Sequence, residues 1–291
     1  MLGVIGDIAQ DVVVRLKEEI RPATDTASEI ETGRGGSAAN VAAFSASRHP
    51  TRFIGCVGDD MAGPVLIHDL ESRGVEVRAQ VRGSTAMIVV MIDDDGERSM
   101  FPSRGASGLI EHVPHDWLEG IEILHVTGYS LQSEPSASSV MDAVRRVKEA
   151  GGEVSLDVSS TGMIEQCGVD RFRRLIVDLA PDFVSSNQEE SEHLGLTAGD
   201  GAGPLLDRLP DTMLLARAGT EPTRIFHGGE LLTEVPVLPA EEVLDMTGAG
   251  DAFNAGFLTG VLAGADLRKA CDAGHALART VVAHRGASDG T

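Results

Sequence analysis

One stretch near the end of the chain, VLDMTGAGDAFNAGFLTG at residues 243–260, combines acidic residues with small ones just before an apolar run. The apolar sequence after Asp251 predicts a helix, and its first turn would contain Gly248, Ala249 and Gly250. Backbone N–H groups in a first helical turn are unpaired, and the helix dipole is positive there. Because glycine lets a ligand approach the backbone closely, this stretch predicts an anion hole suited to a phosphate or to developing phosphoryl charge.

Asp251 at the mouth of this anion hole would repel a phosphate, so it is not placed to bind one directly. It suits a base that takes the proton of an attacking hydroxyl, or a carboxylate linked to magnesium. The same text also suits an ordinary helix start with glycines for packing and an aspartate as a cap. No Walker A lysine accompanies the glycines, and GVIGDI does not match GxGxxG, which disfavours P-loop kinases and dinucleotide enzymes.

Strands and helices alternate along the chain and must position these residues. Strands are expected at 2–6, 52–58, 121–128, 153–159, 182–187 and 212–217, and helices at 37–47, 64–73, 136–150, 171–179 and 188–194. This alternation predicts an α/β fold built from βαβ units on a parallel sheet. The α/β core is expected to comprise 1–10, 35–74 and 105–291, with a small β appendage from two insertions at 11–34 and 75–104.

The residues that follow each strand are the candidates for a site, because open α/β sheets bind ligands at the carboxyl ends of their strands. These positions are Gly6 to Asp11, Gly35 to Asn40, Gly58 to Asp60, Gly128, Asp157, Asn187 to Glu190, Ala218–Gly219 and Asp245 to Asp251.

Bulk properties exclude several classes of protein. The chain has 45 Asp and Glu against 24 Lys and Arg, a net charge of −21, so no nucleic-acid partner is expected. No apolar run approaches the roughly 18 residues that cross a membrane, and no signal peptide precedes the first strand, so no membrane association is expected. The three cysteines are scattered and predict neither disulfides nor a metal site, which suits a cytoplasmic protein.

Four motifs appear in a familiar order: GDIAQD, GRGGSAANVA, NQEE and DMTGAGDAFNAGF. With them the chain resembles the ribokinase-like family of sugar and nucleoside kinases, also called the phosphofructokinase-B type. The order and spacing of the four motifs extend over nearly the whole chain. The resemblance implies a three-layer α/β/α fold with a small β-sheet lid formed by the two insertions. It also implies transfer of the γ-phosphoryl group of Mg-ATP to a substrate hydroxyl.

The resemblance assigns roles on the catalytic and ATP side. Asp251 would be the catalytic base beside the Gly-Ala-Gly anion hole. Asn187 and Glu190 would organise Mg²⁺ and the phosphates, with Glu190 reaching the metal through water; a helix-cap asparagine with a surface glutamate is the alternative. Gly219 and Thr247 would also contact ATP.

The resemblance assigns other residues to the sugar and to a cation. The substrate-binding set is Asp11, Gly35, Gly36, Ser37, Asn40 and Arg104. Asp245 and Thr247 resemble the start of a potassium-binding loop whose other half would lie at 283–288. Whether K⁺ is required stays open, because this dependence varies within the family.

The chain departs from the family pattern at three positions. Ala9 stands where ribokinase has an asparagine that helps to bind ribose, and Ser37 stands where it has a lysine, so both weaken ribose as the substrate. Pro222 replaces the second glycine of the G-x-x-G that commonly ends the nucleotide-side strand, although Gly219 is retained.

The lid text GERSMFPSRGAS, residues 96–107, bears on the substrate class. Arg104 would meet the carboxylate of a sugar acid, as arginines in roughly this region do in similar kinases, or would pair with a nearby acid instead. Phe101 is the main lid aromatic that could stack a nucleobase. The chain has only 3% aromatic residues, which favours sugars over nucleosides.

Three functions remain open at this stage: a sugar or sugar-acid kinase, a nucleoside kinase of the same fold, and a non-catalytic small-molecule-binding member. The intact Asp251 and its glycines argue against the third. A homodimer formed through the lid is expected from the resemblance, since paired lids hide their sheet edges.

Overall fold

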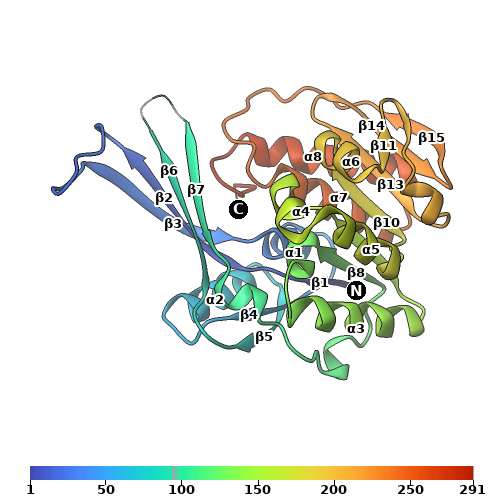
Figure 1. The fold of residues 1–291 in the computed structure, drawn as a ribbon, viewed down its shortest axis with the longest axis horizontal. Helices are drawn as coiled ribbons and strands as arrows, with labels where there is room; N and C mark the ends of the chain where they lie inside the picture. Colours follow the sequence, from blue (N-terminus) through green and yellow to red (C-terminus); the bar gives the residue numbers. More distant parts are fainter. Residues whose placement is uncertain (94, 96, 291) are drawn as a thin grey trace.

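The computed structural model describes residues 1–93, 95 and 97–290. A nine-stranded sheet forms the main body, in the spatial order β15 (Glu230–Val235), β14 (Glu221–His227), β13 (Met213–Ala218), β10 (Phe183–Asn187), β9 (Glu153–Asp157), β8 (Ile123–Thr127), β1 (Leu2–Ile5), β4 (Thr51–Val57) and β5 (Glu76–Val81). A four-stranded sheet projects from this body as a lid, in the order β3 (Ser28–Gly35), β2 (Ala9–Leu16), β6 (Ala86–Ile92) and β7 (Arg98–Ser103) (Figure 1).

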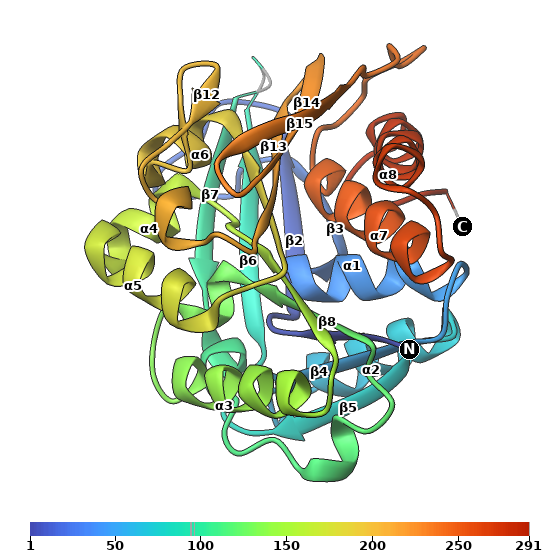
Figure 2. The same cartoon turned by 90° about the vertical axis from the view of Figure 1, so that its right-hand side faces the viewer.

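Helices cover both faces of the central sheet. One face carries α1 (Ser37–Ala46), α2 (Ala62–Ser72), α7 (Ala249–Leu262) and α8 (Leu267–Val282). The other carries α3 (Ser136–Glu149), α4 (Thr161–Cys167), α5 (Val169–Leu179) and α6 (Gln188–Leu194) (Figure 2). Short elements in the connections are η1 (Gly105–Gly108), η2 (His115–Trp117), η3 (Gly128–Leu131), η4 (Leu206–Arg208), β11 (Thr197–Ala198) and β12 (Gly201–Ala202). The predicted three-layer α/β/α fold with a lid is confirmed.

The seven strands from β13 to β5 are all parallel to their neighbours, as the βαβ pattern predicts. β14 and β15 then extend the sheet as antiparallel strands. The sequence pattern does not predict these two strands, because polar residues and Pro222 interrupt their apolar periodicity.

The predicted boundary of the lid is wrong in one place. The segment 75–104 was expected to lie wholly in the lid, but β5 pairs in parallel with β4 and forms the edge of the central sheet. β4, α2 and β5 therefore form one more βαβ unit. The second lid segment therefore begins only at β6. The prediction was wrong because a strand pattern alone does not reveal which sheet a strand joins.

The core lies between the sheet and its two helical layers. Strand β4 is buried along its whole length, as expected for a strand covered on both faces. The largest fully buried side chains include Phe44, Phe53, Phe172 and Phe226, each of which stabilises the fold by about 1.5–3 kcal/mol. None of the helices within the described residues is long and apolar enough to cross a membrane.

Small residues fix the position of α7 against α8. A Cβ at Gly256 would lie 2.5 Å from the carbonyl oxygen of Ala273, and one at Gly274 would lie 2.7 Å from that of Phe253. Both glycines therefore allow a close approach that any larger residue would prevent. This packing holds the N-terminus of α7 at the carboxyl ends of the parallel strands.

Candidate active site

A cavity of about 650 Å³ lies beneath the lid, at the carboxyl ends of β9, β10 and β13. Lid residues Ile88, Met100 and Pro102 form one wall, and the first turn of α7 forms another. Most of the predicted site residues line this cavity: Asp11, Gly36, Ser37, Asn40, Arg104, Asn187, Glu190, Thr247, Gly248, Gly250 and Asp251. Residues from five separate parts of the sequence thus meet in one place.

Four predicted residues lie outside the lining of this cavity. Gly35 lies behind Asp11, because a Cβ at Gly35 would lie 2.1 Å from the Asp11 carboxylate. Ala249 opens α7, and Gly219 occupies the turn between β13 and β14. Asp245 lines a second cavity of about 310 Å³, between the lid and residues 285–288. The roles predicted for these residues stay predictions.

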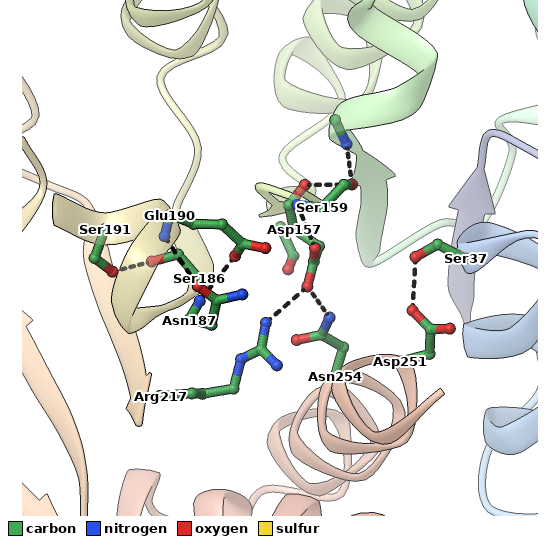
Figure 3. Close-up of polar contacts among 12 residues, drawn as sticks. Ser37, Asp157, Ser159, Ser186, Asn187, Glu190, Ser191, Arg217, Asp251 and Asn254 are labelled. Carbon is green, nitrogen blue, oxygen red and sulfur yellow. Dashed lines mark hydrogen bonds and ion pairs between the residues drawn. The ribbon is translucent and has the colours of Figure 1, made fainter. Parts of the chain in front are cut away.

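Asp251 is held by two neutral donors from α1. Ser37 Oγ donates to Oδ1 over 2.6 Å, as Figure 3 shows, and Asn40 Nδ2 donates to Oδ2 over 2.8 Å. Burial raises the pKa of Asp251 to about 7, the charges of Asp157 and Asp7 add to the rise, and the two hydrogen bonds oppose it. The carboxyl group can therefore exchange a proton near neutral pH.

The position of α1 depends on Asp7, which follows β1. Its carboxylate accepts the backbone N–H of Ser37 over 2.9 Å and that of Ala38 over 3.3 Å. This satisfies N–H groups at the start of α1 and adds an anion at the positive end of the helix. Asp7 therefore fixes the helix that carries both donors to Asp251.

The first turn of α7, the predicted anion hole, follows a glycine in the left-handed backbone conformation. Gly248 caps the helix with φ of 80°, and a Cβ there would lie 2.7 Å from that of Ala287, so glycine is required. A Cβ at Gly250 would lie 2.8 Å from Nη1 of Arg217. A guanidinium group therefore lies directly against this turn.

Arg217 belongs to a polar cluster that the sequence analysis missed. Its Nη2 donates to Asp157 Oδ2 over 3.2 Å, and Asn254 Nδ2 donates to the same oxygen (Figure 3). Asp157 Oδ1 accepts the backbone N–H of Ser159. Asp157 was noted only as a strand end. Two further signals were available: Arg217 stands two residues before Gly219, and Asn254 lies one helical turn after Asp251.

Asn187 and Glu190 form a capping box at the start of α6. Asn187 Oδ1 accepts the N–H of Glu190, and Glu190 Oε2 accepts the N–H of Asn187. Burial raises the pKa of Glu190 to about 7, and the negative charge of Asp157 adds to this rise. The pair is thus a helix cap, and it also places a second carboxyl group on the cavity near Asp157.

Asp11 has a buried carboxylate oxygen to which no group of the described residues donates a hydrogen bond. Burial raises the pKa of Asp11 to about 6, Arg34 opposes the rise and Asp7 adds to it. Within the described residues, Asp11 Oδ1 is buried and accepts no hydrogen bond. A buried acceptor of this kind is costly unless a ligand donates to it, and a sugar hydroxyl is a suitable donor.

The lid residues contribute a cation and apolar surface. The Arg104 guanidinium stacks over the Tyr129 ring at 4.2 Å from its centroid, and the side chain enters no ion pair within the part of the chain that the structure describes. Met100 and Pro102 line the cavity, whereas Phe101, between them on β7, is 55% exposed and is not part of the lining.

Comparisons with known proteins found relatives in sequence and in structure. The model of the pfkB family of carbohydrate kinases matches residues 1–291. A fructokinase from Klebsiella pneumoniae is 34% identical over 242 residues, which are 79% of this chain and 77% of that protein.

Solved structures share the fold over the whole chain. An adenosine kinase from Sinorhizobium meliloti has a TM-score of 0.85 at 24% identity, covering 100% of this chain and 96% of its own. A putative ribokinase II from Escherichia coli, solved in complex with ATP and Mg²⁺, has a TM-score of 0.83 at 23% identity, covering 100% of this chain and 95% of its own.

Proposed function

Because the chain belongs to the pfkB family of carbohydrate kinases, we propose that it transfers the γ-phosphoryl group of ATP to a hydroxyl of a sugar or sugar acid. One observation carries this proposal. A carboxyl group with a pKa raised to about 7, Asp251, stands at the glycine-rich start of a helix beneath a lid. A base and an anion hole are thereby side by side, as phosphoryl transfer to an alcohol requires.

In this proposal Asp251 takes the proton of the acceptor hydroxyl as its oxygen attacks the γ-phosphorus. The new phosphorus–oxygen bond forms on the sugar, and the bond to the β-phosphate oxygen breaks to release ADP. Ser37 and Asn40 hold the carboxylate in place through the two hydrogen bonds described above. The backbone N–H groups of Gly250 and Asp251, in the first turn of α7, stabilise the charge that develops on the phosphoryl oxygens, whereas that of Ala249 donates to Met246 O.

Arg217 is a cation that lies against this anion hole. Its guanidinium lies against Gly250 and pairs with Asp157, and its Nε is buried without a partner within the described residues. We propose that Arg217 binds the phosphoryl group during its transfer, because a guanidinium pairs with phosphate oxygens through several donors in fixed geometry.

The residues present fit a magnesium ion carried by ATP. Glu190 and Asp157 are carboxylates that repel each other, and a divalent cation near them would relieve that repulsion. Within the described residues, no group of three metal-binding side chains could hold the ion alone. Glu190, acting through water, would therefore share Mg²⁺ with the phosphates, and the bound ion would neutralise phosphate charge.

The cavity favours a polyol over a nucleoside. Asp11 offers an unpaired carboxylate oxygen to hydroxyl groups, whereas Phe101, the lid aromatic best suited to stack a base, is not part of the cavity wall. Arg104 enters no ion pair within the described chain, so it is available to a carboxylate on the substrate. A sugar acid would use all of these groups.

The test is direct measurement of ADP formation from Mg-ATP across pentoses, hexoses, 2-keto-3-deoxy sugar acids, sugar phosphates and nucleosides. Turnover on a sugar or sugar acid, lost in Asp251→Asn and kept in Asp272→Asn on the exposed side of α8, is the expected result. Turnover confined to nucleosides would overturn the substrate class. If no substrate of this set gives ADP although ATP is shown to bind, the result would favour a non-catalytic ligand-binding protein.

The lid also supports the proposal of a homodimer. Its outer strands, β3 and β7, expose Ile30 at 63% and Phe101 at 55%. Exposed edge strands with apolar residues invite pairing with another copy of the same sheet. Light scattering after size-exclusion chromatography should give a dimer for the wild type and a monomer for Phe101→Asp; a monomeric wild type would contradict the proposal.

A further inference from the structure

Arg98, the first residue of lid strand β7, links the lid to the loop that leads into the anion hole. Its Nη1 donates to Asp245 Oδ1 over 2.9 Å and to Thr247 Oγ1 over 3.2 Å. Asp245 is only 9% exposed, whereas the Arg98 side chain is 40% exposed. The arginine therefore brings a positive charge from the surface of the lid to a nearly buried carboxylate.

The surroundings of Asp245 do not fit the potassium ion that the family resemblance implies for this loop. A carboxylate offers about four lone-pair sites to hydrogen-bond donors or metal ions. Oδ1 accepts from Thr247 N, Thr247 Oγ1 and Arg98 Nη1, and Oδ2 accepts from Gly286 N. Four protein donors thus surround the carboxylate, three on Oδ1 and one on Oδ2, and one of them already carries the single positive charge that K⁺ would supply.

The two halves of the loop are also joined without an ion. The bond from Gly286 N to Asp245 crosses from one half to the other. Gly248 packs so closely on Ala287 that a Cβ at Gly248 would lie 2.7 Å from the Ala287 Cβ. Segment 245–248 is therefore fixed against segment 286–287 by backbone packing and one carboxylate.

We propose that Arg98 takes the place of a monovalent cation in this loop, so that the enzyme needs no potassium and its lid is coupled to its anion hole. Strand β7 makes this coupling possible, because Arg98 at its start bonds to the Asp245 loop while Arg104, just past its end, lies over the substrate cavity. When the lid lies over the substrate, the bond from Arg98 to Asp245 therefore also holds in place the turn that contains Gly248 and Gly250. Arg98 is a positioning residue in this scheme, since it acts through Asp245.

The experiment compares salts of equal ionic strength: potassium, sodium and tetramethylammonium chloride. ADP is quantified by chromatography, because coupling enzymes can themselves respond to potassium. The wild type is expected to show the same kcat in all three salts within about twofold, and Arg98→Ala to lose about tenfold in sodium and to regain most of it in potassium. Lys17→Ala, which removes an exposed lid ion pair with Glu29, is the matched control and should behave as the wild type.

A second readout needs no substrate. Potassium, compared with sodium, should raise the melting temperature of ligand-free Arg98→Ala and leave that of the wild type unchanged. The activity test rests on the proposed kinase function, but the melting test does not, so failure of the one proposal is distinguishable from failure of the other.

The outcomes that would overturn the proposal are specific. Strong stimulation of the wild type by potassium would show that the ion, and not Arg98, serves this loop. An Arg98→Ala variant with unchanged kcat and no potassium response would show that the contact has no role. Should Arg98→Ala fail to fold, Arg98→Lys, which keeps the charge, must remain independent of potassium; dependence in that variant would likewise contradict the proposal.

Discussion

Two aspartates six residues apart, Asp245 in the loop before α7 and Asp251 in the first turn of α7, have opposite surroundings. Burial pushes the pKa of Asp245 upward, but hydrogen bonds from Arg98, Thr247 and Gly286 outweigh it and hold the pKa well below its ordinary value. Within the described residues Asp251 has two donors, both neutral, so burial dominates and its pKa rises to about 7. Asp245 therefore stays an anion that organises the loop, whereas Asp251 can accept a proton.

The difference teaches that the number and charge of donors, not the residue type, separate a structural carboxylate from a chemical one. Both aspartates flank the same glycines, and both lie near the start of α7. Asp245 accepts from the guanidinium of Arg98 and from the backbone N–H groups of Thr247 and Gly286, whereas Asp251 faces the cavity. Exchanging each residue in turn is the direct way to test this contrast.

The largest expected effect is the loss of the base. Asp251→Asn removes the proton acceptor and keeps the shape, so kcat should fall by about 10³-fold while ATP still binds. Steady-state kinetics together with calorimetric titration of ATP would measure both quantities. A variant that kept a tenth of the wild-type kcat would place the base elsewhere and break the contrast between the two aspartates.

The next effect concerns the anion hole between them. A methyl group at Gly250 would displace the Arg217 guanidinium, since the added Cβ would lie 2.8 Å from Nη1. We expect Gly250→Ala to lower kcat by about 10²-fold, the scale seen when an oxyanion donor is removed. Gly201→Ala, on exposed β12 with no atom closer than 3.8 Å, is the matched control. Equal kinetics for both variants would argue against a phosphoryl role for Arg217.

Most of the residues that the sequence motifs predicted line the cavity, and the reason is physical. Glycines at 36 and 248 are required by backbone geometry, and Asp251 and Glu190 stand at helix starts, so short local patterns encode their roles. Arg98 carries no such local signature, and for Arg217 the local signal is only its position two residues before Gly219. Their partners lie 147 and 60 residues away in sequence, and arginine is ordinary on any surface.

The same limit applies to the fold. The rhythm of strands and helices predicted the parallel sheet, because apolar periodicity is a local property. It placed β5 in the wrong sheet, because pairing with β4 is decided by the path of α2 between them. Long-range pairing is therefore where sequence patterns lose information, both for strands and for the arginines of the site.

A smaller effect is expected at Asp245. Asp245→Asn weakens four hydrogen bonds, one of them from a guanidinium, and should cost about 1–3 kcal/mol of unfolding free energy. Because the folded pKa is lowered, the ionised form stabilises the fold above the ordinary aspartate pKa of about 4, and this stabilisation is lost as the pH falls. Urea unfolding of both proteins at several pH values should thus show a difference that is full at neutral pH and shrinks in acid. A difference that stayed constant with pH would contradict the assigned charge state.

The smallest expected effect is a shift in the pH profile. Activity should rise with pH through about 7, because Asp251 must be ionised to accept a proton. Ser37→Ala removes one of the two hydrogen bonds that lower this pKa, so the apparent pKa of kcat/KM should move upward by about one unit. Ser138→Ala, on the exposed side of α3, should leave the profile unchanged, and so should Asp245→Asn. A shift in Asp245→Asn as large as that in Ser37→Ala would mean that the two aspartates titrate as one system, and the separation of their roles would fail.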